Sequence, residues 1–159
     1  MIVIGIDPGT SCGWAMLDAA GQRIGSGTWD LKPRRHEGGG MRYLRVRQHL
    51  AALLDAADGP VVVAYEEVRR HAGVDAAHVY GGIVGALGAL CEERGVPYQG
   101  VLPQAAKRAA TGKGNAPKEA MIAAAVARWL HEPQTDDEAD ALWVAEALRL
   151  ELGLATGAA

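Results

Sequence analysis

The chain opens with a short apolar run that ends on an acid. Ile2 to Ile6 is rich in β-branched residues, and Asp7 and the turn residues Pro8-Gly9 follow it. A continuous apolar run of this length is typical of a strand buried on both faces. Residues 13–18 and 23–29, the latter with period-two alternation, predict two more strands. Together the three segments predict an antiparallel meander.

Downstream, helical and extended patterns alternate. The run 60–67 predicts a buried strand ending in carboxylates, and 97–101 predicts a fifth strand. Helices are expected at about 41–57, 76–94, 104–110, 117–130 and 136–152. The first of these helices should bury one face made of Leu44, Leu50, Leu53 and Leu54. Pro117 suits the first position of its helix, and Gly95 closes another. This order predicts an α/β fold with a mixed five-stranded sheet flanked by helices.

Length and composition limit the class of protein. The 159 residues fit one domain, which we place at 1–152, followed by a flexible tail at 153–159. No apolar run reaches the ~18 residues of a membrane span, and no basic region precedes the first strand as in a secretory signal. Cys12 and Cys91 show neither metal-type spacing nor a disulfide framework, which fits a reducing cytoplasm. The net charge of -3 does not by itself indicate nucleic-acid binding.

Acidic residues stand where the central strands end. Asp7 ends the first strand, and Glu66 and Glu67 end the fourth. Ligand sites in open α/β sheets form at the carboxyl ends of strands, so these acids would meet if the two strands are neighbours. Asp7 has a plainer interpretation, since Asp before Pro-Gly often caps a turn. Glu66 and Glu67 are adjacent and point to opposite faces, so one is solvated and the other buried.

The last helix begins with further acids. Asp137 and Asp140 are three residues apart and therefore share one helix face. Thr135 and Glu138 form a capping-box pattern, and acids in the first turn are favoured by the helix dipole, so Asp137 needs no function. Asp140 lies beyond that turn and precedes an apolar stretch, where the dipole does not explain it. We therefore expect the last helix to bring acids to the strand ends.

Clustered carboxylates raise one another's pKa or bind a cation. All-oxygen ligands suit the hard divalent ions Mg²⁺ and Mn²⁺. Two such ions roughly 4 Å apart activate a water and stabilise the leaving oxygen of a phosphodiester. The pattern therefore indicates the chemistry of metal-dependent nucleases.

Three segments resemble the acidic motifs of RuvC-type Holliday junction resolvases. They are Ile4-Gly5-Ile6-Asp7-Pro8-Gly9-Thr10, Ala64-Tyr65-Glu66-Glu67-Val68 and Asp137-Glu138-Ala139-Asp140-Ala141-Leu142. Their order and separation match the family over nearly the whole chain. The resemblance implies a ribonuclease H-like fold, a homodimer, and cleavage of four-way DNA with two Mg²⁺ or Mn²⁺ ions per active site. By motif position it assigns the catalytic, metal-binding carboxylates to Asp7, Glu66, Asp137 and Asp140. It places positively charged residues that assist the active site at Lys107 and Lys118.

The chain departs from this family just after the second motif. Bacterial members carry an aromatic residue there that handles bases at the junction centre, whereas this chain has Arg69 and Arg70. An arginine plane also stacks on bases and can substitute. The sequence preference at the cut is therefore open, and the chain resembles a divergent or phage member.

Basic residues concentrate in two segments that flank the acids along the chain. The first holds Lys32, Arg34, Arg35, Arg42, Arg45 and Arg47 with one acid, Glu37; the second holds Arg69, Arg70, Lys107, Arg108, Lys113 and Lys118. Each residue taken alone fits a solvated surface. Taken together they fit DNA backbones converging on the acids, and we expect DNA contacts from Arg34, Arg35, Arg42, Arg69, Arg70, Lys107, Lys113 and Lys118.

The helix at 76–94 is rich in glycine, each of which costs about 1 kcal/mol relative to alanine in a helix interior. Gly81, Gly85 and Gly88 lie on one side, where another backbone can approach closely. That backbone belongs either to this chain's own sheet or to a second copy. A homodimer suits a symmetric junction, which needs two cuts.

These observations favour a structure-selective DNA endonuclease. One alternative is a nucleotide-phosphate site, because the Asp-Pro-Gly-Thr turn is also similar to the phosphate loops of actin-like ATPases and sugar kinases. Those proteins need two such domains, and this chain has room for one. The other alternative is a protein that binds junctions without cutting them, which the complete set of acids argues against.

Overall fold

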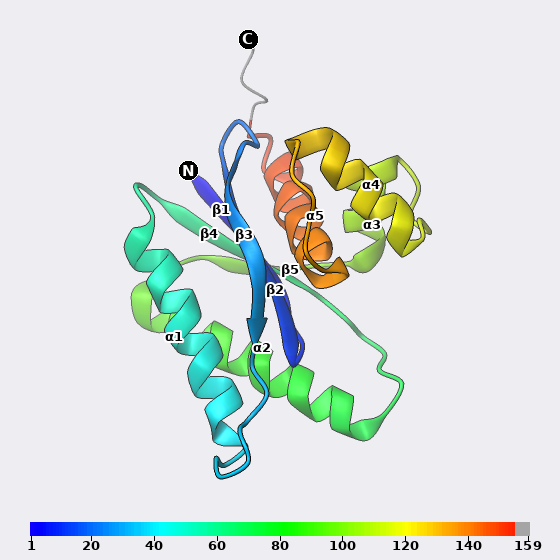
Figure 1. Cartoon of the computed structure of the whole chain (residues 1–159). Coiled ribbons are helices and arrows are strands. Elements are labelled where there is room, and N and C mark those ends of the chain that lie inside the picture. Colours follow the sequence, from blue (N-terminus) through cyan, green and yellow to red (C-terminus); the bar gives the residue numbers. More distant parts are fainter. Residues whose placement is uncertain (155–159) are drawn as a thin grey trace.

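The structure is a computed structural model and describes residues 1–154. The central strand of its sheet is β1 (Ile2–Asp7) (Figure 1). β1 pairs antiparallel with β2 (Ser11–Asp18) and parallel with β4 (Val61–Glu66). β3 (Arg23–Asp30) and β5 (Tyr98–Val101) form the two edges, giving the order β3-β2-β1-β4-β5. The predicted meander and the mixed five-stranded sheet are confirmed.

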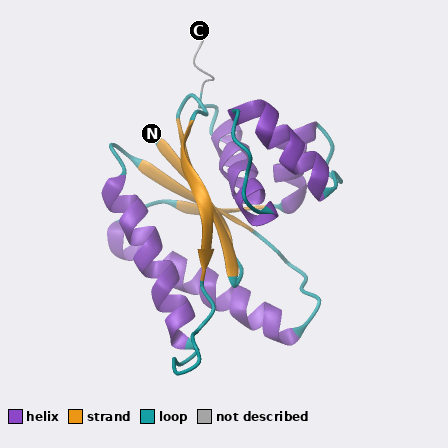
Figure 2. Cartoon of the chain, viewed as in Figure 1, coloured by secondary structure: helices purple, strands orange, loops and turns teal. Residues whose placement is uncertain are grey.

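Helices cover both faces of this sheet (Figure 2). One face carries α1 (Gly40–Ala56) and α2 (Val74–Arg94), and the other carries α3 (Pro103–Thr111), α4 (Lys118–Trp129) and α5 (Asp136–Glu151). The apolar run of β1 serves both layers: Ile2, Ile4 and Ile6 pack toward α1 and α2, and Val3 packs toward α5. A strand buried on both faces therefore explains the unbroken apolar run.

Two details of the predicted helices are wrong. Leu44 is 44% exposed, because the buried stripe of α1 follows Tyr43, Val46 and Leu50 instead. Leu44 comes one residue after Tyr43 and so points about 100° away from that stripe. Pro117 precedes the first helical residue of α4 as its N-cap, rather than occupying the first position.

α5 lies directly on β1 and β2 because two strand glycines leave room for it. A Cβ atom at Gly5 would lie 2.2 Å from the carbonyl oxygen of Ala141, and one at Gly13 would lie 1.8 Å from that of Asp137. Backbone atoms cannot yield as a flexible side chain can. These two glycines therefore allow α5, which carries Asp137 and Asp140, to lie close to the sheet.

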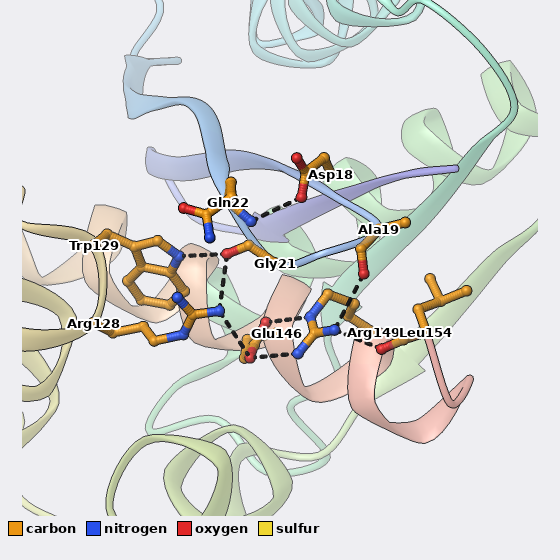
Figure 3. A network of polar contacts seen from close by, with 9 residues as sticks. All are labelled: Asp18, Ala19, Gly21, Gln22, Arg128, Trp129, Glu146, Arg149 and Leu154. Atoms are coloured by element: carbon orange, nitrogen blue, oxygen red, sulfur yellow. Dashed lines mark hydrogen bonds and ion pairs between the residues drawn. The ribbon is translucent and has the colours of Figure 1, made fainter. Parts of the chain in front are cut away.

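The far end of α5 is held by a buried network of ion pairs and hydrogen bonds (Figure 3). Arg149 is fully buried and donates to Glu146 through Nε at 2.7 Å and Nη2 at 2.9 Å. Its Nη1 donates to the carbonyls of Ala19 and Leu154, at 3.2 and 2.6 Å. A buried guanidinium is tolerated only when its donors are satisfied in this way. The network joins α5 to the turn between β2 and β3.

The first residues of the expected C-terminal tail contact α5. The N–H of Gly153 donates to the carbonyl of Leu150 at 3.0 Å, and that of Leu154 donates to the carbonyl of Arg149 at 3.2 Å. The remaining tail, residues 155–159, lies outside the described residues.

One helix has the length and mean composition of a membrane span, although the sequence contains no unbroken apolar run of ~18 residues. Among residues 1–154, α2 is long and apolar enough to cross a membrane, with a mean hydropathy of 1.4 in its most apolar window. One such helix is weak support for a span, since core helices of soluble proteins meet the same criterion. In this fold α2 buries Ile83, Leu87 and Leu90 in the layer beside α1.

Candidate active site

Acidic side chains from three elements approach one another where β1 and β4 end. Asp7 is the last residue of β1 and Glu66 the last of β4. The parallel register pairs Ile6 with Tyr65, so the two acids follow on neighbouring strands. Asp140 approaches from α5, which packs across both strands. The first and fourth strands are neighbours, which is the condition under which the sequence brings these acids together.

Burial and neighbouring charges shift the pKa values of these acids. Burial, and then the negative charges of Glu66 and Asp140, raise the pKa of Asp7 well above its usual range. Burial also raises the pKa of Glu66, although Lys107 and a hydrogen bond with Asp7 oppose this effect. The pKa of Asp140 rises to about 7, through burial and then through Glu66. The site concentrates negative charge in a poorly hydrated place, which favours binding of a cation.

Glu66 and Glu67 point to opposite faces as strand alternation requires, but both are half-buried, so the expected division into one solvated and one buried acid is wrong. Glu66 lines the acidic site, whereas the Glu67 side chain lies against Gly100 on the other side and pairs with Arg69 at 3.2 Å. The alternation left open which of the two faces the site. The structure places Glu66 there.

Asp137 lies at the edge of this group rather than at its centre. Its carboxylate accepts a hydrogen bond of 2.6 Å from Ser11 Oγ, at the start of β2. Its charge also adds to the repulsion that raises the pKa of Asp7 and Asp140. Sequence reasoning missed Ser11, because a lone serine after a turn carries no pattern that would single it out.

The first turn of α5 is fixed against β3. The Thr135 hydroxyl accepts from the N–H of Glu138 at 3.1 Å, which is half of the predicted capping box. The other half is absent, since the Glu138 carboxylate accepts from the N–H of Gln134 at 2.8 Å and from Ser26 Oγ at 2.6 Å. The buried Glu138 therefore holds the turn that presents Asp137.

Both predicted lysines lie beside the acids. Lys107 on α3 and Lys118 at the start of α4 line a pocket of about 340 Å³ together with Glu66 and Asp140. Lys118 also forms an ion pair with Asp136, which sequence reasoning did not connect to the site. A pocket lined by both carboxylates and ammonium groups suits a bound phosphodiester with cations.

The donor set fits a hard divalent cation. Within residues 1–154, no three Asp, Glu, His or Cys side chains converge tightly into a ready-made cage. Mg²⁺ keeps several of its waters and is typically held by one or two carboxylates, so a complete cage is not required. The nearby Cys12 is no competing soft ligand, because burial raises the pKa of its thiol to about 12.

The proposed DNA-binding residues divide into free and paired side chains. Arg34 and Arg35 are exposed in the segment between β3 and α1, at the end of the sheet where β1 also ends (Figure 1). Arg42 lies nearby, and its Nε is buried without a partner among the described residues. Arg70 and Lys113 are exposed, whereas Arg69 pairs with Glu67. Arg45 and Arg47 are engaged by Glu37 and Glu93, so that part of the basic segment serves the fold.

A family model described as crossover junction endodeoxyribonuclease RuvC matches residues 3–147. This chain belongs to the RuvC family. The RuvC proteins of Anaeromyxobacter sp. (strain Fw109-5) and Heliobacterium modesticaldum are 36% and 30% identical to it over 149 and 151 residues. Each alignment covers 91% of this chain, and 71% and 91% of the respective relative.

Solved structures of RuvC-type proteins share the fold. Thermus thermophilus RuvC in complex with a Holliday junction substrate superposes with a TM-score of 0.82 at 22% identity, covering 98% of this chain and 97% of that one. The yeast mitochondrial Holliday junction resolvase Ydc2 gives 0.63 at 14% identity, covering 96% and 79%. The ribonuclease H-like fold expected from the resemblance to this family is therefore confirmed.

The raised pKa values predict how stability varies with pH in metal-free protein. Because the pKa of Asp140 is higher folded than unfolded, its contribution to stability is full below about pH 4 and is lost as pH rises through about 7. We expect the melting temperature in EDTA to fall between about pH 5 and about pH 8, and Asp140→Asn to reduce that fall. The exposed Asp58→Asn is the control. Equal slopes for all three proteins would contradict the assigned burial of Asp140.

Proposed function

We propose that this protein resolves four-way DNA junctions by divalent-metal-dependent hydrolysis of phosphodiesters. The observation that carries the proposal is the juxtaposition of Asp7, Glu66 and Asp140 with two lysines at one end of the sheet. Membership in the RuvC family supports the same substrate, since family members are described as crossover junction endodeoxyribonucleases. A solved relative with this fold is described in complex with a Holliday junction.

In this proposal the carboxylates of Asp7, Glu66, Asp137 and Asp140 hold two ions, Mg²⁺ or Mn²⁺. When bound, such ions supply an activated water and neutralise charge on the leaving oxygen. Lys107 and Lys118 contact the scissile phosphate, orient it for in-line attack and stabilise the charge that develops. Ser11 limits the motion of Asp137, and Asp136 holds Lys118 close to the acids.

We further propose that a set of eight basic residues binds the arms of the junction. The set comprises Arg34, Arg35, Arg42, Arg69, Arg70, Lys107, Lys113 and Lys118. Arg34→Glu with Arg35→Glu should weaken junction binding about tenfold or more at low salt, because phosphate contacts release counterions. Arg94→Gln, which removes a surface pair with Asp55, is the control. A junction affinity that changes neither with these substitutions nor with ionic strength would show that this surface does not bind DNA.

We propose a homodimer through the outer face of α2. A Cβ at Gly82 would meet Tyr43 at 2.2 Å and one at Gly88 would meet Tyr98 at 3.3 Å, so these two glycines serve the chain's own packing. Gly81 and Gly85 are exposed, and a Cβ there would meet nothing within 4 Å. Small residues on an exposed helix face let a second copy approach, which would place two active sites on one symmetric junction.

Gly85→Leu tests this interface without altering the core of one protomer. We expect light scattering to give the monomer mass for Gly85→Leu and twice that mass for the unaltered protein, because the new side chain separates the two helices. Gly38→Ala, at another open position, should leave the mass unchanged. A monomer mass for the unaltered protein at assay concentration would remove the dimer from the proposal.

Cleavage of a labelled synthetic four-way junction tests the function directly. With Mg²⁺ or Mn²⁺ we expect paired nicks near the branch point, and no cleavage of a linear duplex of the same sequence or of the junction in EDTA. Tight binding without nicks would indicate a junction-binding protein. ATP hydrolysis without nicks would indicate the nucleotide-phosphate alternative. We place this reaction in the cytoplasm, where the buried free thiols of Cys12 and Cys91 remain reduced.

A further inference from the structure

The hydrogen-bond ladder between β1 and β4 lacks one backbone donor at the candidate active site. In its register the N–H of Ile2 donates to the carbonyl of Pro60 at 2.8 Å, and Ile6 pairs with Tyr65. Continuing this parallel ladder, the carbonyl of Glu66 would next accept from the N–H of residue 8. Residue 8 is proline and has no N–H. The carbonyl of Glu66, which presents a key carboxylate, therefore has no donor from β1.

Tyr80 on α2 supplies the missing donor. Its hydroxyl donates to the carbonyl of Glu66 at 2.9 Å and accepts from the N–H of Val68 at 3.0 Å. Between them, the N–H of Glu67 still donates to β5 through the carbonyl of Val101 at 2.8 Å. One phenol oxygen thus spans the end of β4 on both sides of Glu67. Burial raises the pKa of Tyr80, so the hydroxyl keeps the proton that it donates.

The Tyr80 ring is itself held in place. Its centroid lies 4.7 Å from that of His71, in the loop that leaves β4. The ring also lines a pocket of about 400 Å³ with Pro8 and Thr10 from the turn after Asp7. Tyr80 therefore contacts the segment that follows β4 and shares a pocket with the turn that follows β1.

We propose that Tyr80 is a positioning residue for the acidic site: its hydroxyl replaces the donor that Pro8 cannot provide and so holds the Glu66 carboxylate in place for metal binding. This inference rests on the proposed nuclease function. Tyr80 does not touch the substrate in this account and acts only through Glu66. Small displacements of a reacting group are costly in enzymes, with about 1 Å worth up to about 100-fold in rate.

Tyr80→Phe removes the hydroxyl and keeps the ring. We expect the single-turnover cleavage rate at limiting Mn²⁺ to fall about tenfold or more, and the Mn²⁺ concentration for half-maximal rate to rise, while junction affinity in EDTA stays within about twofold. Tyr98→Phe is the matched control, since that hydroxyl donates to the exposed Glu92 at 3.2 Å, near the other end of α2. It should cleave at the rate of the unaltered protein.

Amide hydrogen exchange at Val68 measures the hydrogen bond between its N–H and the Tyr80 hydroxyl, independently of any cleavage. We expect Val68 to exchange faster in Tyr80→Phe, with exchange in the central strand β1 unchanged, which also shows that the variant is folded. Mn²⁺ affinity measured calorimetrically in the absence of DNA should fall in parallel. Unchanged Val68 exchange and unchanged Mn²⁺ affinity would overturn the proposal. If the unaltered protein cuts no junction, the nuclease function fails, while these two measurements still decide the role of Tyr80.

Discussion

Asp7→Asn should lower the rate of four-way junction cleavage by at least about 1,000-fold and leave junction affinity within about twofold. The asparagine keeps the size of the side chain but removes the central charge of the acidic group. Besides burial, the negative charges of Glu66, Asp140 and Asp137 all act on Asp7 and raise its pKa. A bound cation would therefore relieve the repulsion at this carboxylate. The measurement is single-turnover cleavage beside a binding titration in EDTA.

The same substitution should stabilise the protein when no metal is present. Burial and neighbouring acids raise the pKa of Asp7 above its unfolded value, so its ionisation opposes folding as pH rises. The melting temperature of Asp7→Asn in EDTA should therefore exceed that of the unaltered protein at about pH 8. Asp30→Asn, an exposed acid at the end of β3, should change neither activity nor melting temperature. Normal cutting by Asp7→Asn would show that the assigned site is wrong.

Gly13→Ala should damage both stability and activity. The added Cβ would lie 1.8 Å from the carbonyl oxygen of Asp137, so α5 must move away from β2. Overpacking costs roughly 1–3 kcal/mol and occasionally more, and we expect about 3 kcal/mol here because the opposing atom is backbone. At roughly 2–4 °C per kcal/mol for a chain of this size, the melting temperature should fall by about 6–12 °C.

Cleavage by the folded fraction of Gly13→Ala should also fall, by about tenfold or more, because Asp137 moves with the helix. The rate is measured well below the melting temperature, so that loss of folded protein does not contribute. Gly38→Ala, where a Cβ meets nothing within 4 Å, should match the unaltered protein in both measurements. A Gly13→Ala protein with normal stability would mean that α5 does not sit on β2 as closely as described.

Local patterns in the sequence were sufficient to predict the secondary structure and the place where the acids gather. Period-two and continuous apolar runs predicted the five strands, and the ends of the first and fourth brought Asp7 and Glu66 to one edge. The prediction that Leu44 is buried is wrong, because Tyr43 occupies the first position of the buried stripe of α1. Tyr43 also fills the space beside Gly82.

The parts that sequence could not predict depend on pairs of residues far apart in the chain. Ser11 and Asp137 are 126 positions apart, and a single hydroxyl leaves no periodic signal. In the sequence, Tyr80 is a single aromatic residue in a helix of small residues. Its role becomes apparent only from the register of β1 and β4, which leaves the Glu66 carbonyl opposite Pro8. Likewise, the glycines of α2 formed one group in the sequence, but the structure separates Gly82 and Gly88 from Gly81 and Gly85.

The most direct test of the whole account is anomalous scattering from crystals equilibrated with Mn²⁺ at a concentration that supports cleavage. We expect Mn²⁺ peaks bounded by the carboxylates of Asp7, Glu66 and Asp140, and we expect these peaks to be lost in crystals of Asp7→Asn. Mn²⁺ bound elsewhere on the protein, with no peak at these three carboxylates, would contradict this expectation.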